Sequence, residues 1–344
     1  MKAFLLEQPG KVSLREVAPP QPAAGEVLVR VAACGICHTD LHYIDHGVPT
    51  FKSPVILGHE VSGTVAGVGA GVTHFRADDR VLLPAVFTCG TCRACRTGRE
   101  NICQQMRMLG NHLDGAYAEY VVAPGKDCFA LPAEIPLAEA CLIGDAMSTP
   151  YHAVKHRARV RVGETVAVFG CGGVGINAVQ FAALAGGHVI AVDIDDYKLE
   201  LACQFGARDI LNARSVERVD KELKKRTGGG VDIALEVIGK PDTIRTAYDS
   251  LRPGGRLCVV GYSAEPVTLP FTKMMFFELS ILGSLGCRPT DYPELIELVR
   301  AKRVTLEPLV TGRYSLDNIF QGLDALRRGE GLRGIVLPTE KKAA

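Results

Sequence analysis

The chain has 344 residues, which is more than one hydrophobic core usually supports, so we expect two domains. Its 39 lysines and arginines nearly balance 38 aspartates and glutamates, and the formal charge of +1 provides no field for gathering nucleic acid. Charges interrupt every apolar stretch before the roughly 18 residues that a membrane span requires, and the start lacks the apolar core of a signal peptide. We therefore expect a cytoplasmic protein that binds neither nucleic acid nor a membrane.

The first third of the chain has the texture of a β domain. Short apolar runs alternate with glycine-rich turns, and the runs that predict strands are Val27–Val31, Val61–Val65, Arg80–Leu83 and Tyr117–Val122. Such a series of short strands is typical of a partly open β-barrel.

Within this region, between about residues 85 and 105, four cysteines follow the spacing Cys-x2-Cys-x2-Cys-x7-Cys. They are Cys89, Cys92, Cys95 and Cys103. The two-residue gaps let a tight turn direct successive sulfurs at one point, which is the arrangement that a tetrahedral Zn²⁺ needs. Arginines between the cysteines make the segment too polar for a core. We predict a closed structural zinc site, because four thiolates leave no coordination position open for chemistry.

From about residue 160 the pattern changes to apolar strands that alternate with helices. The predicted elements are strands at Val166–Phe169, Val189–Val192, Ile233–Val237 and Leu257–Val260, and helices at Val174–Ala185 and Tyr197–Phe205. Alternating strands and helices indicate a doubly wound parallel sheet. A domain boundary is expected near residues 145–160. The terminal residues 341–344 are expected to be frayed.

A glycine turn connects the first of these strands to its helix. It carries Gly170, Gly172, Gly173, Val174 and Gly175. The first glycine permits the turn, the second lets backbone N–H groups approach a pyrophosphate, and the third lets the helix pack on the strand. The phosphates are expected at the helix N-terminus.

The next strand ends at Asp193, eighteen residues after Gly175. A carboxylate at this position accepts hydrogen bonds from the adenosine ribose and repels a 2′-phosphate, and Asp195 and Asp196 follow it. The sequence therefore predicts NAD rather than NADP, with Lys198 beside the same ribose.

A second metal site is suggested by Cys37 and His59, which lie between turns and near several acids. Catalytic zinc commonly uses three protein ligands and leaves a fourth position for water or substrate. Cys34 makes a two-residue pair with Cys37, but no other closely spaced cysteine pair remains to complete a second four-cysteine site. Cys37 and His59 thus need a third ligand from elsewhere.

Together these motifs resemble the zinc-dependent medium-chain dehydrogenases, a family of alcohol, polyol and threonine dehydrogenases. The resemblance covers nearly the whole chain, because the motifs occur in the family's order. It implies a GroES-like, partly open β-barrel catalytic domain over residues 1–147 and 285–344. It also implies an inserted Rossmann domain with a doubly wound parallel sheet over residues 148–284.

The resemblance implies that Cys37 and His59 are ligands of the catalytic zinc. Asp40 would orient His59, as carboxylates that fix an imidazole ligand commonly do, and Glu60 would lie behind the metal.

Three further roles follow from the same resemblance. Thr39 would hydrogen-bond the substrate oxygen, and His42 would pass the proton to solvent, since histidine titrates near neutrality. Arg333 would reach the cofactor pyrophosphate.

The third zinc ligand departs from the family's usual cysteine. Aligning Thr149 and Tyr151 with the family pattern puts Asp145 at the ligand position, while Cys141 lies four residues earlier. We favour Asp145, with Cys141 and Glu60 as alternatives, because carboxylates are accepted zinc ligands. This version of the motif resembles the branch of cyclic secondary-alcohol and hydroxyacyl-CoA dehydrogenases.

The expected activity is reversible hydride transfer between NAD and a secondary or cyclic alcohol, which yields a ketone or aldehyde. Val48 and residues 84–86 stand where small-alcohol enzymes of the family carry aromatics, which favours a roomier pocket. A polyol, threonine-type or hydroxyacyl-CoA-type dehydrogenase is the first alternative, and a non-catalytic zinc-binding member is the second. The apolar stretch Leu279–Leu285 resembles the family's dimer edge, so we expect a homodimer or homotetramer.

Overall fold

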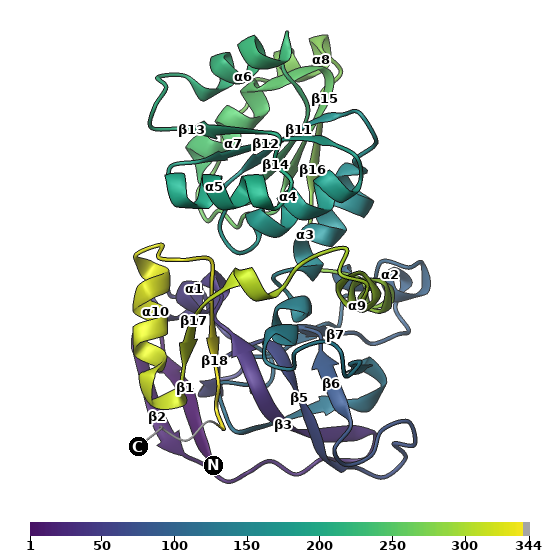
Figure 1. The fold of residues 1–344 in the computed structure, drawn as a ribbon. Coiled ribbons are helices and arrows are strands. Elements are labelled where there is room, and N and C mark those ends of the chain that lie inside the picture. Colours follow the sequence, from purple (N-terminus) through teal and green to yellow (C-terminus); the bar gives the residue numbers. More distant parts are fainter. Residues whose placement is uncertain (340–344) are drawn as a thin grey trace. The chain divides into compact units, whose positions relative to one another are not determined.

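The computed structural model describes residues 1–339, and residues 341–344, expected to be frayed, lie outside this range. The chain forms two compact units (Figure 1). The first contains Met1–Asp145 and the segment from Arg288 onward, and the second contains Ala146–Cys287. The junctions lie two or three residues from the expected boundaries at 147 and 285.

The first unit is built mainly of β-strands. Its strands are β1 (Lys2–Gln8), β2 (Lys11–Glu16), β3 (Glu26–Gly35), β4 (Val55–Ile56), β5 (Glu60–Val68), β6 (Arg80–Leu83), β7 (Val86–Phe87), β8 (Arg107–Met108), β9 (Tyr120–Pro124), β10 (Phe129–Ala130), β17 (Val310–Tyr314) and β18 (Arg333–Val336). Its α-helices are α1 (His38–Ile44), α2 (Arg93–Arg96), α9 (Tyr292–Arg300) and α10 (Ile319–Arg327). Short 3-10 turns, among them η3 (Glu139–Gly144), connect them.

The main sheet of this unit has the order β10-β6-β5-β3-β18-β17, and β9 also pairs with β3. The last strands of the chain therefore lie beside the first ones, because β18 pairs antiparallel with β3 at Ile335 and Gly35. Alternate residues of β3, among them Val27, Val29 and Val31, are fully buried in the apolar core. This closure brings the C-terminal segment next to the turn that carries Cys37.

The predicted strand at Tyr117–Val122 begins later than expected. Strand β9 starts at Tyr120, because the backbone of Tyr117 pairs elsewhere, with its N–H donating to the Leu57 carbonyl at 2.9 Å. Tyr117 is therefore attached to the segment that leads to His59.

The second unit alternates strands and helices. Its strands are β11 (Thr165–Phe169), β12 (His188–Asp193), β13 (Asp209–Asn212), β14 (Val231–Glu236), β15 (Leu251–Val259) and β16 (Ser280–Gly283). Its α-helices are α3 (Ser148–His152), which continues into a π-helical turn, α4 (Gly175–Leu184), α5 (Asp196–Gln204), α6 (Val219–Thr227), α7 (Pro241–Asp249) and α8 (Phe271–Phe276).

These six strands form one parallel sheet with the order β13-β12-β11-β14-β15-β16. In the order of the strands along the chain this is 3-2-1-4-5-6, the Rossmann arrangement, so the predicted doubly wound sheet is confirmed. The strand order reverses between β11 and β14, and ligands of such sheets bind outside the carboxyl ends of the strands at this point. The glycine turn follows β11 at this end.

Candidate functional site

The four lobe cysteines converge as their spacing predicts. Their ligand atoms lie within 4.8 Å of one another, and the Sγ–Sγ distances include 3.5 Å between Cys89 and Cys103 and 3.6 Å between Cys92 and Cys95. Sulfurs at 2.3 Å from a tetrahedral zinc ion are about 3.8 Å apart, so the group fits the ion. Backbone N–H groups of Cys92 and Thr91 lower the pKa of Cys89 to about 5, which favours the thiolate that binds zinc.

A second group of donors forms where three distant segments meet. Cys37 caps the N-terminus of α1, His59 immediately precedes β5, and Asp145 follows η3. The Asp145 Oδ2 lies 3.6 Å from His59 Nε2 and 3.9 Å from Cys37 Sγ. Cys37 and His59 are buried, while the Asp145 side chain is 21% exposed. One thiol, one imidazole and one carboxylate are thus directed at a common point.

Of the alternatives to Asp145, Glu60 belongs to the same group of ligand atoms and Cys141 does not. Burial, and then the nearby Glu60 carboxylate, raise the pKa of the Cys141 thiol well above its ordinary range. A zinc ligand must be a thiolate, so this environment disfavours Cys141 as a ligand.

Asp40 connects the first two donors. Its Oδ2 accepts the backbone N–H of Cys37 at 3.1 Å, which closes the N-terminus of α1 as in a capping box. Its Oδ1 lies 3.6 Å from His59 Nδ1. The carboxylate therefore stands on the side of the imidazole opposite to Asp145, where a group that orients a metal-bound histidine belongs.

Glu60 pairs with Arg333, a contact that the sequence did not reveal. The Arg333 Nη2 donates to Glu60 Oε1, and both side chains are nearly inaccessible to solvent. Burial raises the pKa of Glu60 to about 7, although the Arg333 charge opposes the shift. A Cβ at Gly35 would lie 2.0 Å from Glu60 Oε2, so only glycine leaves room for this carboxylate. The expected role of Arg333 at a pyrophosphate remains a prediction.

Thr39 and His42 both lie on α1, just after Cys37. The Thr39 Oγ1 is 3.6 Å from Cys37 Sγ, so the hydroxyl stands beside the donor group. His42 is half-buried, and its ring centroid lies 5.6 Å from that of His46. Burial, and then His46, lower the pKa of His42, which favours the neutral imidazole that can accept a proton.

The glycine turn has the predicted conformation. Gly170 has a φ of +94°, and a Cβ at Gly175 would lie 1.7 Å from the Gly170 carbonyl oxygen, so both positions require glycine. A Cβ at Gly172 would meet no atom within 4 Å. Open space above the turn is what a dinucleotide needs in order to approach the backbone. Gly173 and Val174 complete the turn before α4.

Asp193 is attached to this turn. Its Oδ2 accepts the Cys171 N–H at 2.6 Å, and its Oδ1 accepts the N–H groups of Ile194 and Asp195. A carboxylate has about four acceptor positions, so one remains for a ribose hydroxyl. Lys198 Nζ lies 3.9 Å from Asp195 Oδ2.

Sequence reasoning missed Asn177, the fully buried polar residue of α4. Its side-chain amide donates to the carbonyls of Gly173 at 2.8 Å and Ala146 at 3.1 Å, and Gln180 donates to its oxygen. These bonds fix the glycine turn to the start of the unit. A single asparagine within the apolar run from Ile176 to Val179 was the signal that could have revealed it.

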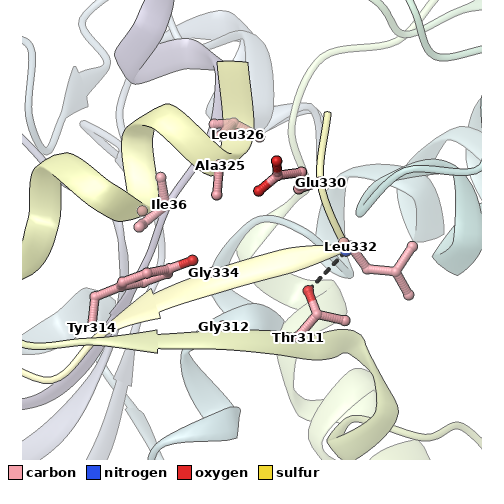
Figure 2. Close-up of a pocket in the computed structure, with 11 residues that line it drawn as sticks. Ile36, Thr311, Gly312, Tyr314, Ala325, Leu326, Glu330, Leu332 and Gly334 are labelled. Carbon is pink, nitrogen blue, oxygen red and sulfur yellow. Dashed lines mark hydrogen bonds between the residues drawn. The ribbon is translucent and has the colours of Figure 1, made fainter. Parts of the chain in front are cut away.

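The donor sets fit the groups that the sequence predicts. His59 Nε2 is buried without a hydrogen-bond partner, although it points at Cys37 and Asp145, and a metal ion would satisfy it. A cavity of about 130 Å³ lies between α10 and strands β17 and β18 (Figure 2). None of the residues that line it has a buried side-chain atom without a hydrogen-bond partner. Its Glu330 pairs with Arg328, and its Thr311 accepts the Leu332 N–H, so we assign it no ligand.

Comparison with known proteins agrees with these sites. Residues 23–133 match the family model of the alcohol dehydrogenase GroES-like domain, and residues 173–301 match that of the zinc-binding dehydrogenases. No helix within residues 1–339 is both long and apolar enough to span a membrane.

Two curated relatives are each 35% identical to this chain. An alcohol dehydrogenase of Geobacillus stearothermophilus aligns over 99% of this chain and 100% of its own length. A sorbitol dehydrogenase of Bacillus subtilis aligns over 95% and 93%. A zinc-binding dehydrogenase of Sinorhizobium meliloti, solved with bound NADP, is 30% identical, has a TM-score of 0.89 and aligns over 98% of this chain and 99% of its own. The chain therefore belongs to the zinc-dependent medium-chain dehydrogenases, a family of NAD(P)-dependent oxidoreductases.

Proposed function

We propose that the protein is an NAD-linked alcohol dehydrogenase that interconverts a secondary or cyclic alcohol and its ketone. The observation that carries this proposal is the convergence of Cys37, His59 and Asp145, with the Thr39 hydroxyl 3.6 Å from the Cys37 sulfur. Glu60, the fourth donor of this group, is paired with Arg333, so Cys37, His59 and Asp145 would leave the fourth tetrahedral position open for an alcohol oxygen. A purely structural site would have closed that position.

When bound, zinc would supply a Lewis acid that favours the alkoxide, and NAD would supply the hydride acceptor. The residues of the chain would do the rest. Cys37, His59 and Asp145 would hold the ion, and the Thr39 hydroxyl would accept the alcohol proton while it passes its own toward His42. His42 would then release the proton to solvent, because its imidazole is half-exposed and neutral near pH 7.

The carboxylate of Asp145 would make the zinc a stronger Lewis acid than a second thiolate would. Oxygen ligands are harder and donate less charge to the ion than sulfur does. Cys141 lies outside the group of ligand atoms, and burial raises the pKa of its thiol, which supports the same assignment.

The preference for NAD rests on Asp193 and the acids that follow it. A 2′-phosphate would meet the Asp193 carboxylate and the nearby Asp195 and Asp196, and these acids outnumber the positive charge of Lys198. The S. meliloti relative was solved with NADP, so the choice needs its own test. Asp193→Asn removes the negative charge that repels a 2′-phosphate. The ratio of kcat/KM with NAD to kcat/KM with NADP should therefore fall by about 10-fold, which corresponds to about 1.4 kcal/mol. An unchanged ratio would contradict the assignment.

For the substrate, the absence of aromatics at Val48 and residues 84–86 supports a secondary or cyclic alcohol. The similarity to the sorbitol dehydrogenase of B. subtilis favours a polyol as the alternative, and an amino alcohol such as threonine is a second one. The hydroxyacyl-CoA branch is a further one.

The test is the rate of NAD reduction with cyclohexanol, 2-butanol, ethanol, sorbitol, threonine and a 3-hydroxyacyl-CoA. We expect the highest kcat/KM with cyclohexanol or 2-butanol. Preference for ethanol would contradict the roomy pocket, and preference for sorbitol or threonine would establish the alternative. No reduction with any alcohol, by a chain that binds only one zinc ion, would favour the non-catalytic reading.

We also propose that copies of the chain pair through β16. This strand is at the end of the parallel sheet, bonded to β15, and the neighbouring residues Phe271, Phe276 and Leu285 are exposed apolar side chains. An exposed apolar strand edge is a template for pairing with a second copy. Light scattering should therefore give the mass of a dimer or tetramer.

A further inference from the structure

A tyrosine lies behind the group of zinc donors, on the far side of Asp40. Tyr117 is completely buried, and its hydroxyl is 2.6 Å from Asp40 Oδ2 and 3.0 Å from the Gly35 carbonyl oxygen. A hydroxyl has one proton to donate, and the carboxylate is both the nearer and the stronger acceptor. Burial, and then the charge of Asp40, raise the pKa of Tyr117 well above its ordinary range, so the hydroxyl remains a donor.

The ring of Tyr117 is held by its own backbone. Its N–H donates to the Leu57 carbonyl at 2.9 Å, and its carbonyl accepts the N–H of Phe4 at 2.8 Å. A Cβ at Gly58 would lie 2.8 Å from the tyrosine ring, so glycine at this position lets the ring pack against the backbone just before His59. The hydroxyl is therefore fixed relative to the segment that presents His59.

Asp40 connects the fixed tyrosine hydroxyl to both zinc donors, Cys37 and His59. Its Oδ2 accepts from the Tyr117 hydroxyl and from the Cys37 N–H, and its Oδ1 faces His59 Nδ1 at 3.6 Å. A carboxylate on two such donors has one permitted orientation, whereas a carboxylate on the Cys37 N–H alone can rotate. A phenylalanine would fill the same apolar space, so packing does not explain the hydroxyl.

We propose that Tyr117 is a positioning residue that fixes the His59 imidazole for zinc through Asp40. The inference rests on the proposed catalytic zinc site and adds a specific residue to it. Residues that hold a metal ligand from behind typically change metal affinity by about 10- to 100-fold when they are replaced.

The test compares zinc release by the zinc-loaded protein and its Tyr117→Phe variant. A chromogenic chelator reports the rate at which each zinc ion leaves, and the lobe zinc on Cys89, Cys92, Cys95 and Cys103 is an internal control. We expect one zinc ion to leave about 10-fold faster from Tyr117→Phe, with the lobe zinc unchanged. The absorption spectrum of Co²⁺ placed in the catalytic site should also shift.

Tyr43→Phe is the matched control. Tyr43 is buried in the same apolar core, and its hydroxyl contacts the Met108 sulfur at 3.8 Å. This variant should release both zinc ions at the wild-type rates. In the Asp40→Asn background the Tyr117→Phe effect should largely vanish, because the two side chains act through one contact.

The outcomes separate this inference from the proposed function. If the wild-type chain holds only the lobe zinc, the proposed catalytic site fails and the inference fails with it. If it holds both ions and Tyr117→Phe releases them at wild-type rates, the site stands and the role of Tyr117 is wrong. Faster release of both ions by the same factor would also overturn it, since that result reports a weakened core.

Discussion

The four-cysteine lobe and the group of Cys37, His59 and Asp145 lie in the same structural unit but are assembled differently. The lobe donors are alike and come from one short segment, with Cys89 and Cys103 only 14 residues apart. The donors of the second group are chemically mixed, and Cys37 and Asp145 are 108 residues apart. Four ligands fill all the positions of a tetrahedral zinc ion, whereas three ligands leave one coordination position open for substrate. Under the proposed function, the lobe braces the fold and the second group performs the chemistry.

The largest expected effect on turnover comes from removing the Thr39 hydroxyl beside the group of Cys37, His59 and Asp145. Thr39→Val keeps the shape of the side chain and removes its proton pathway, so kcat should fall by about 10²- to 10⁴-fold. Because Thr39 is not a ligand, both zinc ions should remain. Metal analysis and steady-state kinetics check this, and near-normal turnover would show that the proposed relay is wrong.

The lobe should respond in the opposite way. Cys103→Ser should lower the zinc content from two ions per chain to one, because Cys103 is a buried donor 3.5 Å from Cys89 Sγ. We expect the melting temperature to fall by several degrees while kcat, measured well below that temperature, stays close to the wild-type value. A loss of kcat as large as that of Thr39→Val would contradict the division of roles.

A smaller effect is expected in the pH dependence of turnover, through His42. The pKa of His42 is lowered from 6.5 by burial and by His46, so the neutral form persists to lower pH than for a free histidine. Turnover of the wild type should therefore decline only below about pH 6.5, as His42 becomes protonated and stops accepting. His42→Gln should reduce kcat by about 10-fold and remove that decline. An acid limb that is unchanged in His42→Gln would exclude His42 as its origin.

The sequence predicted the features that depend on residues close together in the chain, and it missed contacts between residues far apart. The lobe depends on gaps of two and seven residues, and the Rossmann sheet depends on periodicity within single strands and helices, so local patterns were sufficient. Asp145 was predicted as a ligand only because Thr149 and Tyr151 fixed its place in a family pattern, and this prediction stays a proposal. The pair of Glu60 with Arg333 joins residues 273 apart, and that of Tyr117 with Asp40 joins residues 77 apart. No spacing rule predicts such contacts, because they depend on how β18 and the segment before β9 pack beside β3.

The most direct test of the account is the zinc content per chain of the wild type and of Asp145→Ala, measured together with NAD reduction by cyclohexanol. The account predicts two zinc ions in the wild type, one in the variant, and turnover only in the wild type. Two zinc ions retained by Asp145→Ala would contradict the assignment of Asp145 and return the third position to Glu60 or Cys141.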